Sequence, residues 1–352
     1  MPTLFDPLRL GDLTLKNRIV MAPLTRQRSG VRRVPGPMVA EYYRQRASAG
    51  LIVSEATSVT PLGVGYADTP GIWNEAQVEG WKLTTRAVHD AGGLIFLQLW
   101  HVGRISDPHF LDGQAPVSAS AIAAKGEVSL LRPKRPFPTP RALTLEEIPD
   151  VIEAYRQGAE NAKRAGFDGV ELHGANGYLL DQFLQDGSNK RTDAYGGAIP
   201  NRARLMLEAV DAAISVFGAD RVGLHLAPRG DSHTMGDSNP AATFGYVVEQ
   251  ASRRGLAFIC AREHVGDGRI GPQLRAAFNG VWIANEGFDQ ASAEAVLAAG
   301  EADAVAFGKA FIANPDLVER FAAKAALNAL RFETVYAGGA EGYVDYPALE
   351  TV

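Results

Sequence analysis

Short apolar runs recur along the chain, and most of them end in polar or glycine-rich positions. Eight runs have the length and composition of β-strands, and segments with helical periodicity lie between most of them. They cover residues 18–22, 51–56, 94–100, 169–173, 222–227, 256–261, 281–285 and 303–307. Strands that alternate with helices favour a parallel sheet, and eight such units predict a closed (β/α)8 TIM barrel of the α/β class.

The clearest helical pattern follows Thr144. Thr144 and Glu147 have the spacing of a capping box, and the positions after them form one apolar face. That face consists of Ile148, Val151, Ile152, Tyr155, Ala159 and Ala162. The sixth helix is predicted to be the weakest, because residues 273–278 allow only a turn or two.

An alternating pattern near the start predicts a β-hairpin. Leu8 and Leu10 precede the pair Gly11-Asp12, and Leu13 and Leu15 follow it. Two turn-forming residues between alternating apolar positions are typical of a two-residue hairpin loop. In a barrel, this N-terminal hairpin is expected to plug the bottom.

A long loop, residues 102–141, interrupts the rhythm after the third strand. The high density of prolines in this loop argues against a helix or a central strand. The prolines are Pro108, Pro116, Pro133, Pro136, Pro138 and Pro140. A long loop on the catalytic rim is often a lid or a substrate wall, and an inert excursion is an equally compatible interpretation. We expect residues 1–352 to form one barrel domain, with 102–141 inserted at the catalytic face and 336–347 folded back over the mouth.

Composition narrows the class of protein. A chain of 352 residues with 46% hydrophobic and 21% charged positions is typical of a globular enzyme with an ample core. The net charge of −5 gives no basic footprint for nucleic acid, and the single cysteine, Cys260, excludes an internal disulfide or a cysteine metal cluster. The start lacks the apolar core of a signal peptide and no apolar run is long enough to span a membrane. We therefore expect a cytoplasmic enzyme without a metal, monomeric or homodimeric, whose partner is a small molecule.

Polar side chains gather where the predicted strands end. His173, Asn176 and Tyr178 follow the strand at residues 169–173, and the carboxyl ends of the strands are where barrel enzymes hold their catalytic groups. A structural histidine followed by an asparagine turn is the plainer alternative, but the segment stays polar for longer than a turn requires. Gln98 can both donate and accept hydrogen bonds, which suits a pyrimidine ring, and Thr25 offers a hydroxyl.

The His-x-x-Asn-x-Tyr pattern in GVELHGANGYLLDQFL, followed by SNKRTDAYGG and NRARLMLE, closely resembles the old yellow enzyme family of FMN-dependent ene-reductases. The resemblance extends from Ala22-Pro23-Leu24-Thr25 to the segment GYVDYP at 342–347. It implies an enzyme that uses NAD(P)H and FMN to reduce the activated C=C bond of an enone, enal or nitroalkene.

The resemblance also implies site residues. His173 and Asn176 would bind the substrate carbonyl, Tyr178 would supply the proton, and the substrate pocket would include Tyr66, Trp100 and Tyr336. The positions implied to contact FMN are Pro23, Leu24, Thr25, Ala56, Gln98, His225, Glu286, Gly287, Gly308 and Lys309.

Three of these positions depart from the family pattern. The family usually has a small residue where Glu286 stands, and arginine where Lys309 and His225 stand. A carboxylate about 6 Å from a phosphate costs roughly 3 kcal/mol per unit charge, unless Lys309 pairs with it. We therefore expect FMN to bind more weakly than the pattern alone suggests. The alternative function is an old yellow enzyme-like barrel with weakened or lost FMN that performs redox-neutral proton transfer or isomerisation, or binds a ligand.

Overall fold

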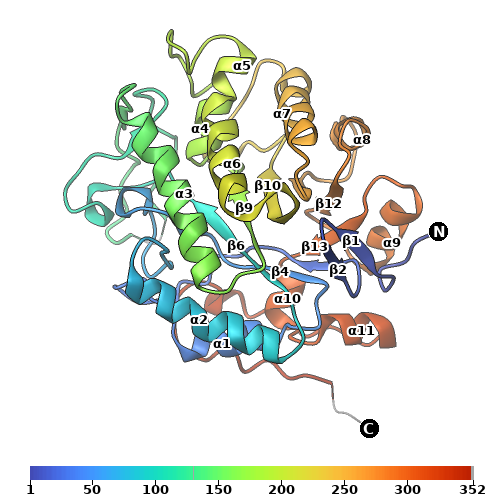
Figure 1. The fold of residues 1–352 in the computed structure, drawn as a ribbon. Helices are drawn as coiled ribbons and strands as arrows, with labels where there is room; N and C mark the ends of the chain where they lie inside the picture. Colours follow the sequence, from blue (N-terminus) through green and yellow to red (C-terminus); the bar gives the residue numbers. More distant parts are fainter. Residues whose placement is uncertain (130, 350–352) are drawn as a thin grey trace.

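Eight parallel strands close into a barrel in the computed structural model, which describes residues 1–129 and 131–349 (Figure 1). In chain order they are β3 (Ile19–Met21), β4 (Leu51–Val53), β6 (Ile95–Trp100), β9 (Gly169–His173), β10 (Val222–Leu226), β11 (Phe258–Arg262), β12 (Val281–Asn285) and β13 (Ala304–Phe307). Each strand pairs with the next in this order, and β13 pairs with β3 to close the ring. The predicted barrel and all eight strand positions are confirmed.

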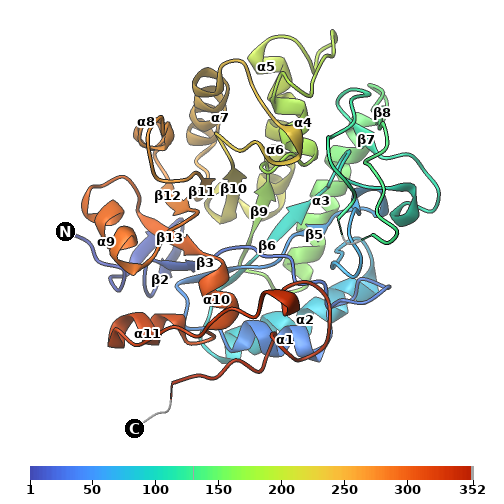
Figure 2. The same cartoon turned by 180° about the vertical axis from the view of Figure 1, so that it is seen from behind.

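Helices surround the strands on the outside, as the two opposite views show (Figures 1 and 2). They are α1 (Pro37–Arg44), α2 (Glu75–Asp90), α3 (Ile148–Arg164), α4 (Leu179–Leu184), α5 (Ile199–Arg202), α6 (Arg204–Phe217), α7 (Pro240–Arg254), α8 (Gly271–Ala276), α9 (Gln290–Ala298), α10 (Lys309–Ala313) and α11 (Leu317–Ala323). Helix α8 has six residues, as short as its sequence predicts. Among the described residues, no helix combines the length and apolarity needed to cross a membrane.

The apolar face predicted for α3 is confirmed, because it is buried except for Ile152, which is half-buried. The predicted capping box is wrong. Glu147 does accept a hydrogen bond from the Thr144 main-chain nitrogen at 2.9 Å, but the Thr144 side chain caps no helix nitrogen. Residues 145–147 form a turn, so the helix begins only at Ile148.

The predicted hairpin is also confirmed. Strands β1 (Leu8–Leu10) and β2 (Leu13–Leu15) pair antiparallel across a turn in which Gly11 has a φ of 56°. Leu10 and Leu15 are fully buried in the apolar cluster that fills the amino-terminal end of the barrel. This cluster includes Val20, Leu51, Phe96, Phe258 and Ile283. The hairpin is therefore a plug.

The loop at residues 102–141 contains little regular structure. It includes the 3-10 turn η2 (Pro108–Phe110) and the strand β7 (Val117–Ser118), which pairs with β8 (Arg141–Ala142) at its end. The other short elements are β5 (Thr57–Ser58), η1 (Pro61–Gly63), η3 (Ala219–Arg221), η4 (Ser232–Thr234) and η5 (Phe332–Thr334).

Strand alternation decides which side chains enter the barrel. In β9, Val170 and Leu172 pack outward into the main core with the helices, so Glu171 and His173 point inward. The same alternation directs Cys260 and Arg262 of β11 inward, because Ile259 and Ala261 belong to the outer core. Polar inward residues near the carboxyl ends of the strands thus supply the walls of the site.

Candidate active site

A cavity of about 710 Å³ lies at the carboxyl ends of the strands. It brings together every residue that the sequence predicted for the site except one. Its lining includes Pro23, Leu24, Thr25, Ala56, Gln98, Trp100, His173, Asn176, Tyr178, His225, Glu286, Gly287, Gly308, Lys309 and Tyr336. We call this space the inner cavity.

The exception, Tyr66, lines an adjoining outer cavity of about 510 Å³. The two cavities share Thr25, Tyr178 and Tyr336, so Tyr66 stands beside the inner cavity rather than apart from it. Residues 127–129, 132 and 134 of the proline-rich loop also line the outer cavity. The loop therefore forms a wall at the mouth, one of the two roles that its sequence allowed.

Two phenols meet where the cavities join. The hydroxyls of Tyr66 and Tyr178 are hydrogen-bonded at 3.0 Å, and the Tyr178 ring lies edge-on to Trp100 and His173 at centroid distances of 5.0 and 4.9 Å. Burial raises the pKa of Tyr178 well above its usual range and that of Tyr66 to about 12. Tyr178 is therefore protonated at neutral pH and has a proton to give.

His173 is held as a neutral imidazole. Burial is the main cause that lowers its pKa well below the usual range, and the charges of His225, Arg262 and His233 add to the effect. The ring stacks on His225 with centroids 5.3 Å apart. Its buried Nδ1 has no hydrogen-bond partner in the described part of the chain.

The backbone and side chain of Asn176 are both fixed. Its φ of 59° lies in the left-handed region, and its carbonyl accepts a hydrogen bond from Nδ1 of His233 at 2.7 Å. The side-chain oxygen accepts from Nη1 of Arg262 at 2.8 Å. The side-chain nitrogen of Asn176 is then left as the donor of a residue that lines the inner cavity.

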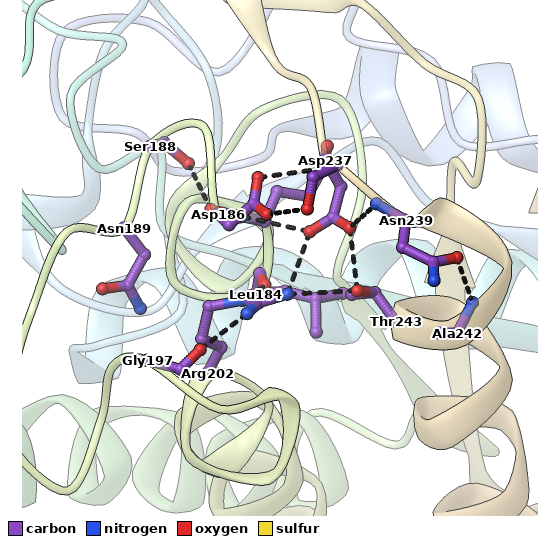
Figure 3. Close-up of polar contacts among 12 residues, drawn as sticks. Leu184, Asp186, Ser188, Asn189, Gly197, Arg202, Asp237, Asn239, Ala242 and Thr243 are labelled. Atoms are coloured by element: carbon purple, nitrogen blue, oxygen red, sulfur yellow. Dashed lines mark hydrogen bonds and ion pairs between the residues drawn. The ribbon is translucent and has the colours of Figure 1, made fainter.

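The remaining polar residues of this stretch hold the loop together. Asp181 accepts from the Gly177 nitrogen at 2.9 Å, and burial raises its pKa to about 6. Further along, the Asp237 carboxylate accepts hydrogen bonds from the Asp186 nitrogen and Arg202, both at 3.1 Å, within the network of Figure 3. The polar segment that follows Tyr178 thus has a structural role.

A buried carboxylate that the sequence did not single out lies beneath the cavity. Glu171 is fully buried and accepts from Nε2 of Gln98 at 2.7 Å, and the same nitrogen lies 3.2 Å from Nδ1 of His225. An amide nitrogen can only donate, so Nδ1 of His225 accepts and Nε2 carries the proton. The expectation that Gln98 offers both a donor and an acceptor to a ligand is therefore wrong, because its N–H groups are directed at Glu171 and His225.

Glu286 has polar partners of its own. Its carboxylate lies 2.7 Å from Nη2 of Arg262 and 3.2 Å from Nε2 of His264. The pairing with Lys309 that could offset its charge is not found among the described residues; Arg262 takes that place. The expected repulsion of a phosphate by Glu286 therefore loses most of its physical basis.

The residues of the inner cavity fit the FMN that the resemblance implies. Nε2 of His225 is a buried donor without a partner in residues 1–129 and 131–349, as the polar edge of a flavin needs. A side chain at Gly308 would come within 3.2 Å of Leu24, so glycine leaves this wall open. The adjacent Lys309 is an exposed cation suited to a phosphate.

Sequence reasoning missed several residues of the cavity wall, of which the most prominent is Arg262. The others are Ala22, His264, Asn285, Phe288, Ala306, Phe307 and Ala310. Arg262 could have been found as a charged residue two positions after Cys260, in the inward register at the end of a predicted strand.

A sequence model described as the NADH:flavin oxidoreductase / NADH oxidase family matches residues 3–328. The chain is 43% identical to 12-oxophytodienoate reductase 1 of Oryza sativa subsp. japonica over 99% of its own length and 94% of the relative's. It is also 43% identical to 12-oxophytodienoate reductase 2 of Arabidopsis thaliana, over 99% and 96% of the two chains.

Solved structures give the same picture. Morphinone reductase in complex with tetrahydroNAD is 50% identical, with a TM-score of 0.96 over 99% of this chain and 98% of that one. The old yellow enzyme homologue from Zymomonas mobilis is 45% identical, also with a TM-score of 0.96, over 99% and 100% of the two chains.

Proposed function

The chain belongs to the NADH:flavin oxidoreductase / NADH oxidase family, so the resemblance to the old yellow enzymes is confirmed, and from this premise we propose that His173, Asn176 and Tyr178 carry out alkene reduction. The protein is an NAD(P)H-dependent flavin oxidoreductase of the ene-reductase type, acting on small molecules with an activated C=C bond. One observation supports the three roles above all: a protonated phenol and two fixed donor side chains face the same cavity.

FMN would supply the hydride when it is bound, and the side chains of this chain manage the charge and the proton. As the substrate is reduced, negative charge develops on its carbonyl or nitro oxygen. The imidazole of His173 and the amide nitrogen of Asn176 donate hydrogen bonds to that oxygen. Preorganised donors of this kind are worth roughly 3–4 kcal/mol each in oxyanion holes.

The proton comes from Tyr178. Its phenol lies beside His173, and the hydroxyl of Tyr66 can donate to its oxygen as the proton leaves, since the two oxygens are 3.0 Å apart. Holding this hydrogen bond ready stabilises the charge that builds on the Tyr178 oxygen. We assign Trp100 and Tyr336 to the substrate wall because they line the same cavity.

We place FMN against Pro23, Leu24, Thr25, Ala56, Gln98 and His225, with its phosphate near Gly287, Gly308 and Lys309. The alternative of a barrel that has lost FMN is disfavoured, because one of the three departures behind it was the unpaired charge of Glu286, and that carboxylate is paired with Arg262. We further propose that residues 1–352 act as one barrel domain, in the cytoplasm, as a monomer or homodimer.

The test is substrate-dependent consumption of reductant. The purified protein is saturated with FMN, and NADH or NADPH oxidation is followed with and without 2-cyclohexenone under anaerobic conditions. We expect enone-dependent oxidation and one saturated ketone for each NAD(P)H consumed. If the protein binds FMN fully but no enone, enal or nitroalkene stimulates NAD(P)H oxidation, the proposal is contradicted. An isomerised product without NAD(P)H consumption would support redox-neutral chemistry instead.

A further inference from the structure

Arg262 joins two parts of the site that are far apart in the sequence. From the end of β11, its guanidinium donates through Nη1 to the side-chain oxygen of Asn176 at 2.8 Å and through Nη2 to Glu286 at 2.7 Å. Nη1 also lies 3.4 Å from the hydroxyl of Ser232. Arg262 lines the inner cavity, and its side chain is 32% exposed.

We propose that Arg262 is a positioning residue that fixes the amide of Asn176 with its nitrogen facing the substrate oxygen, and that Glu286 holds Arg262 for this task. The proposal deepens the proposed function and rests on it, because it concerns the donor that Asn176 presents.

The chemistry of the two groups allows only one orientation of the amide. An asparagine side chain can exchange its oxygen and nitrogen by a half-turn, and the two orientations occupy nearly the same volume. A guanidinium has five donors and no acceptor, so a turned Asn176 would place its own N–H groups against those of Arg262. The contact is favourable only when the Asn176 oxygen faces Arg262 and the nitrogen faces away from it.

Other contacts fix the rest of Asn176, so this half-turn is the freedom that matters. The left-handed backbone is held by the hydrogen bond from His233 to the Asn176 carbonyl and by that from the Gly177 nitrogen to Asp181. None of these bonds involves the Asn176 side chain. The orientation of the amide therefore depends on Arg262.

Glu286 explains why the guanidinium stays in place. Its carboxylate takes the second nitrogen of Arg262, and the fork of the guanidinium then spans Asn176 and Glu286 in a fixed geometry. Glu286 also adopts a φ of 94°, which is rare for a residue other than glycine. Glu286, a carboxylate near the proposed phosphate site, thus supports the hydrogen bond that Asn176 donates to the substrate oxygen.

The first experiment measures Kd for 4-chlorophenol, whose phenolate resembles the developing oxyanion, in the FMN-loaded protein. Arg262→Met removes the hydrogen bonds to Asn176 and Glu286, and we expect it to weaken binding about tenfold or more. We expect a loss of the same size in Asn176→Ala. The double variant should be no weaker than either single variant. Arg262→Lys, which keeps a donor-only cation, should recover most of the loss.

The matched control is Arg229→Met. Arg229 is also 32% exposed and also lies in an ion pair, with Glu263 at 2.8 Å, but none of its hydrogen bonds reaches Asn176. Unchanged phenol affinity in Arg262→Met, or losses that add in the double variant, would overturn the proposal. Failure of wild-type protein to bind phenol or reduce any alkene would instead count against the proposed function.

A second readout needs no FMN and no turnover. The side-chain amide signal of Asn176 in a nitrogen-15 correlation spectrum of the apoprotein is assigned by its loss in Asn176→Ala. We expect this signal to move in Arg262→Met and Glu286→Gln but not in Arg229→Met. A signal that stays in place in Arg262→Met overturns the inference even if that variant folds poorly enough to complicate the affinity measurement.

Discussion

Replacing Tyr178 by phenylalanine isolates the proton from the shape of the site. The substitution keeps the ring that lies edge-on to Trp100 and His173, so it opens no cavity and removes only the hydroxyl. It deletes the proton that we assign to the α-carbon of the alkene, and it leaves the hydroxyl of Tyr66 without its partner.

The two losses differ in size. A buried hydroxyl left without a partner costs about 1–3 kcal/mol, and Tyr66 belongs at the low end because it is only half-buried beside a cavity. Loss of a general acid costs about 10²–10⁴-fold in rate, or roughly 3–5 kcal/mol of barrier. A rate effect of that size can therefore not come from the hydrogen bond alone.

Stopped-flow absorbance separates the two halves of the cycle. Loss of the visible flavin band on mixing with NAD(P)H should be nearly unchanged in Tyr178→Phe, whereas return of the band on adding 2-cyclohexenone should slow by about 10²-fold or more. Tyr66→Phe is the matched variant, because it breaks the same hydrogen bond and keeps the Tyr178 proton. It should slow the second half far less.

Equal slowing of both halves by Tyr178→Phe would refute the reasoning, because it would show that the phenol shapes the cavity for both ligands. So would equal effects of Tyr66→Phe and Tyr178→Phe on the enone step, since the hydrogen bond would then account for the whole loss.

Two further predictions concern buried carboxylates. His225→Arg places a permanent charge next to Glu171 and the proposed flavin edge, and it should raise the FMN midpoint potential by on the order of 50 mV, with His225→Gln as the uncharged control; no rise in the arginine variant would contradict this placement. Burial raises the pKa of Glu55 to about 7, so the folded protein, relative to the unfolded chain, loses stability as the pH rises from about 4 to about 7. Glu55→Gln should abolish this loss of about 3 kcal/mol in the free energy of unfolding, measured by thermal denaturation between about pH 4 and pH 7, and an unchanged pH dependence would show that Glu55 ionises normally.

The fold could be predicted from the sequence because each barrel strand is an apolar run with a polar end. The carboxyl ends of parallel strands meet at one end of a barrel. Once the barrel is predicted, residues as distant in sequence as Thr25, His173 and Lys309 are therefore expected to line one cavity, as they do. The start of α3 was less predictable, because Glu147 bonds to the Thr144 backbone as a capping box requires, but the Thr144 side chain caps no helix nitrogen and the box stays half formed.

Pairings between strand ends were beyond the sequence. Glu286 looks unfavourable for a phosphate when it is considered alone, and only its contact with Arg262, which is 24 residues away, offsets its charge. Gln98 looks like both a donor and an acceptor for a flavin until Glu171, which is 73 residues away, is seen to take its N–H group, which leaves only the acceptor. Such effects depend on side-chain direction and distance at the same time, and a periodic pattern gives only the direction.

The plug formed by β1 and β2 has a consequence for the kinetics. Leu10 and Leu15 fill the amino-terminal end of the barrel, so ligands reach the inner cavity from the opposite end, beside Tyr66 and Tyr336. A nicotinamide and an alkene that bind in the same part of the inner cavity cannot be bound at the same time, and both must enter and leave through this one end. Each is therefore a competitor of the other, and an excess of alkene should slow turnover by excluding the reductant.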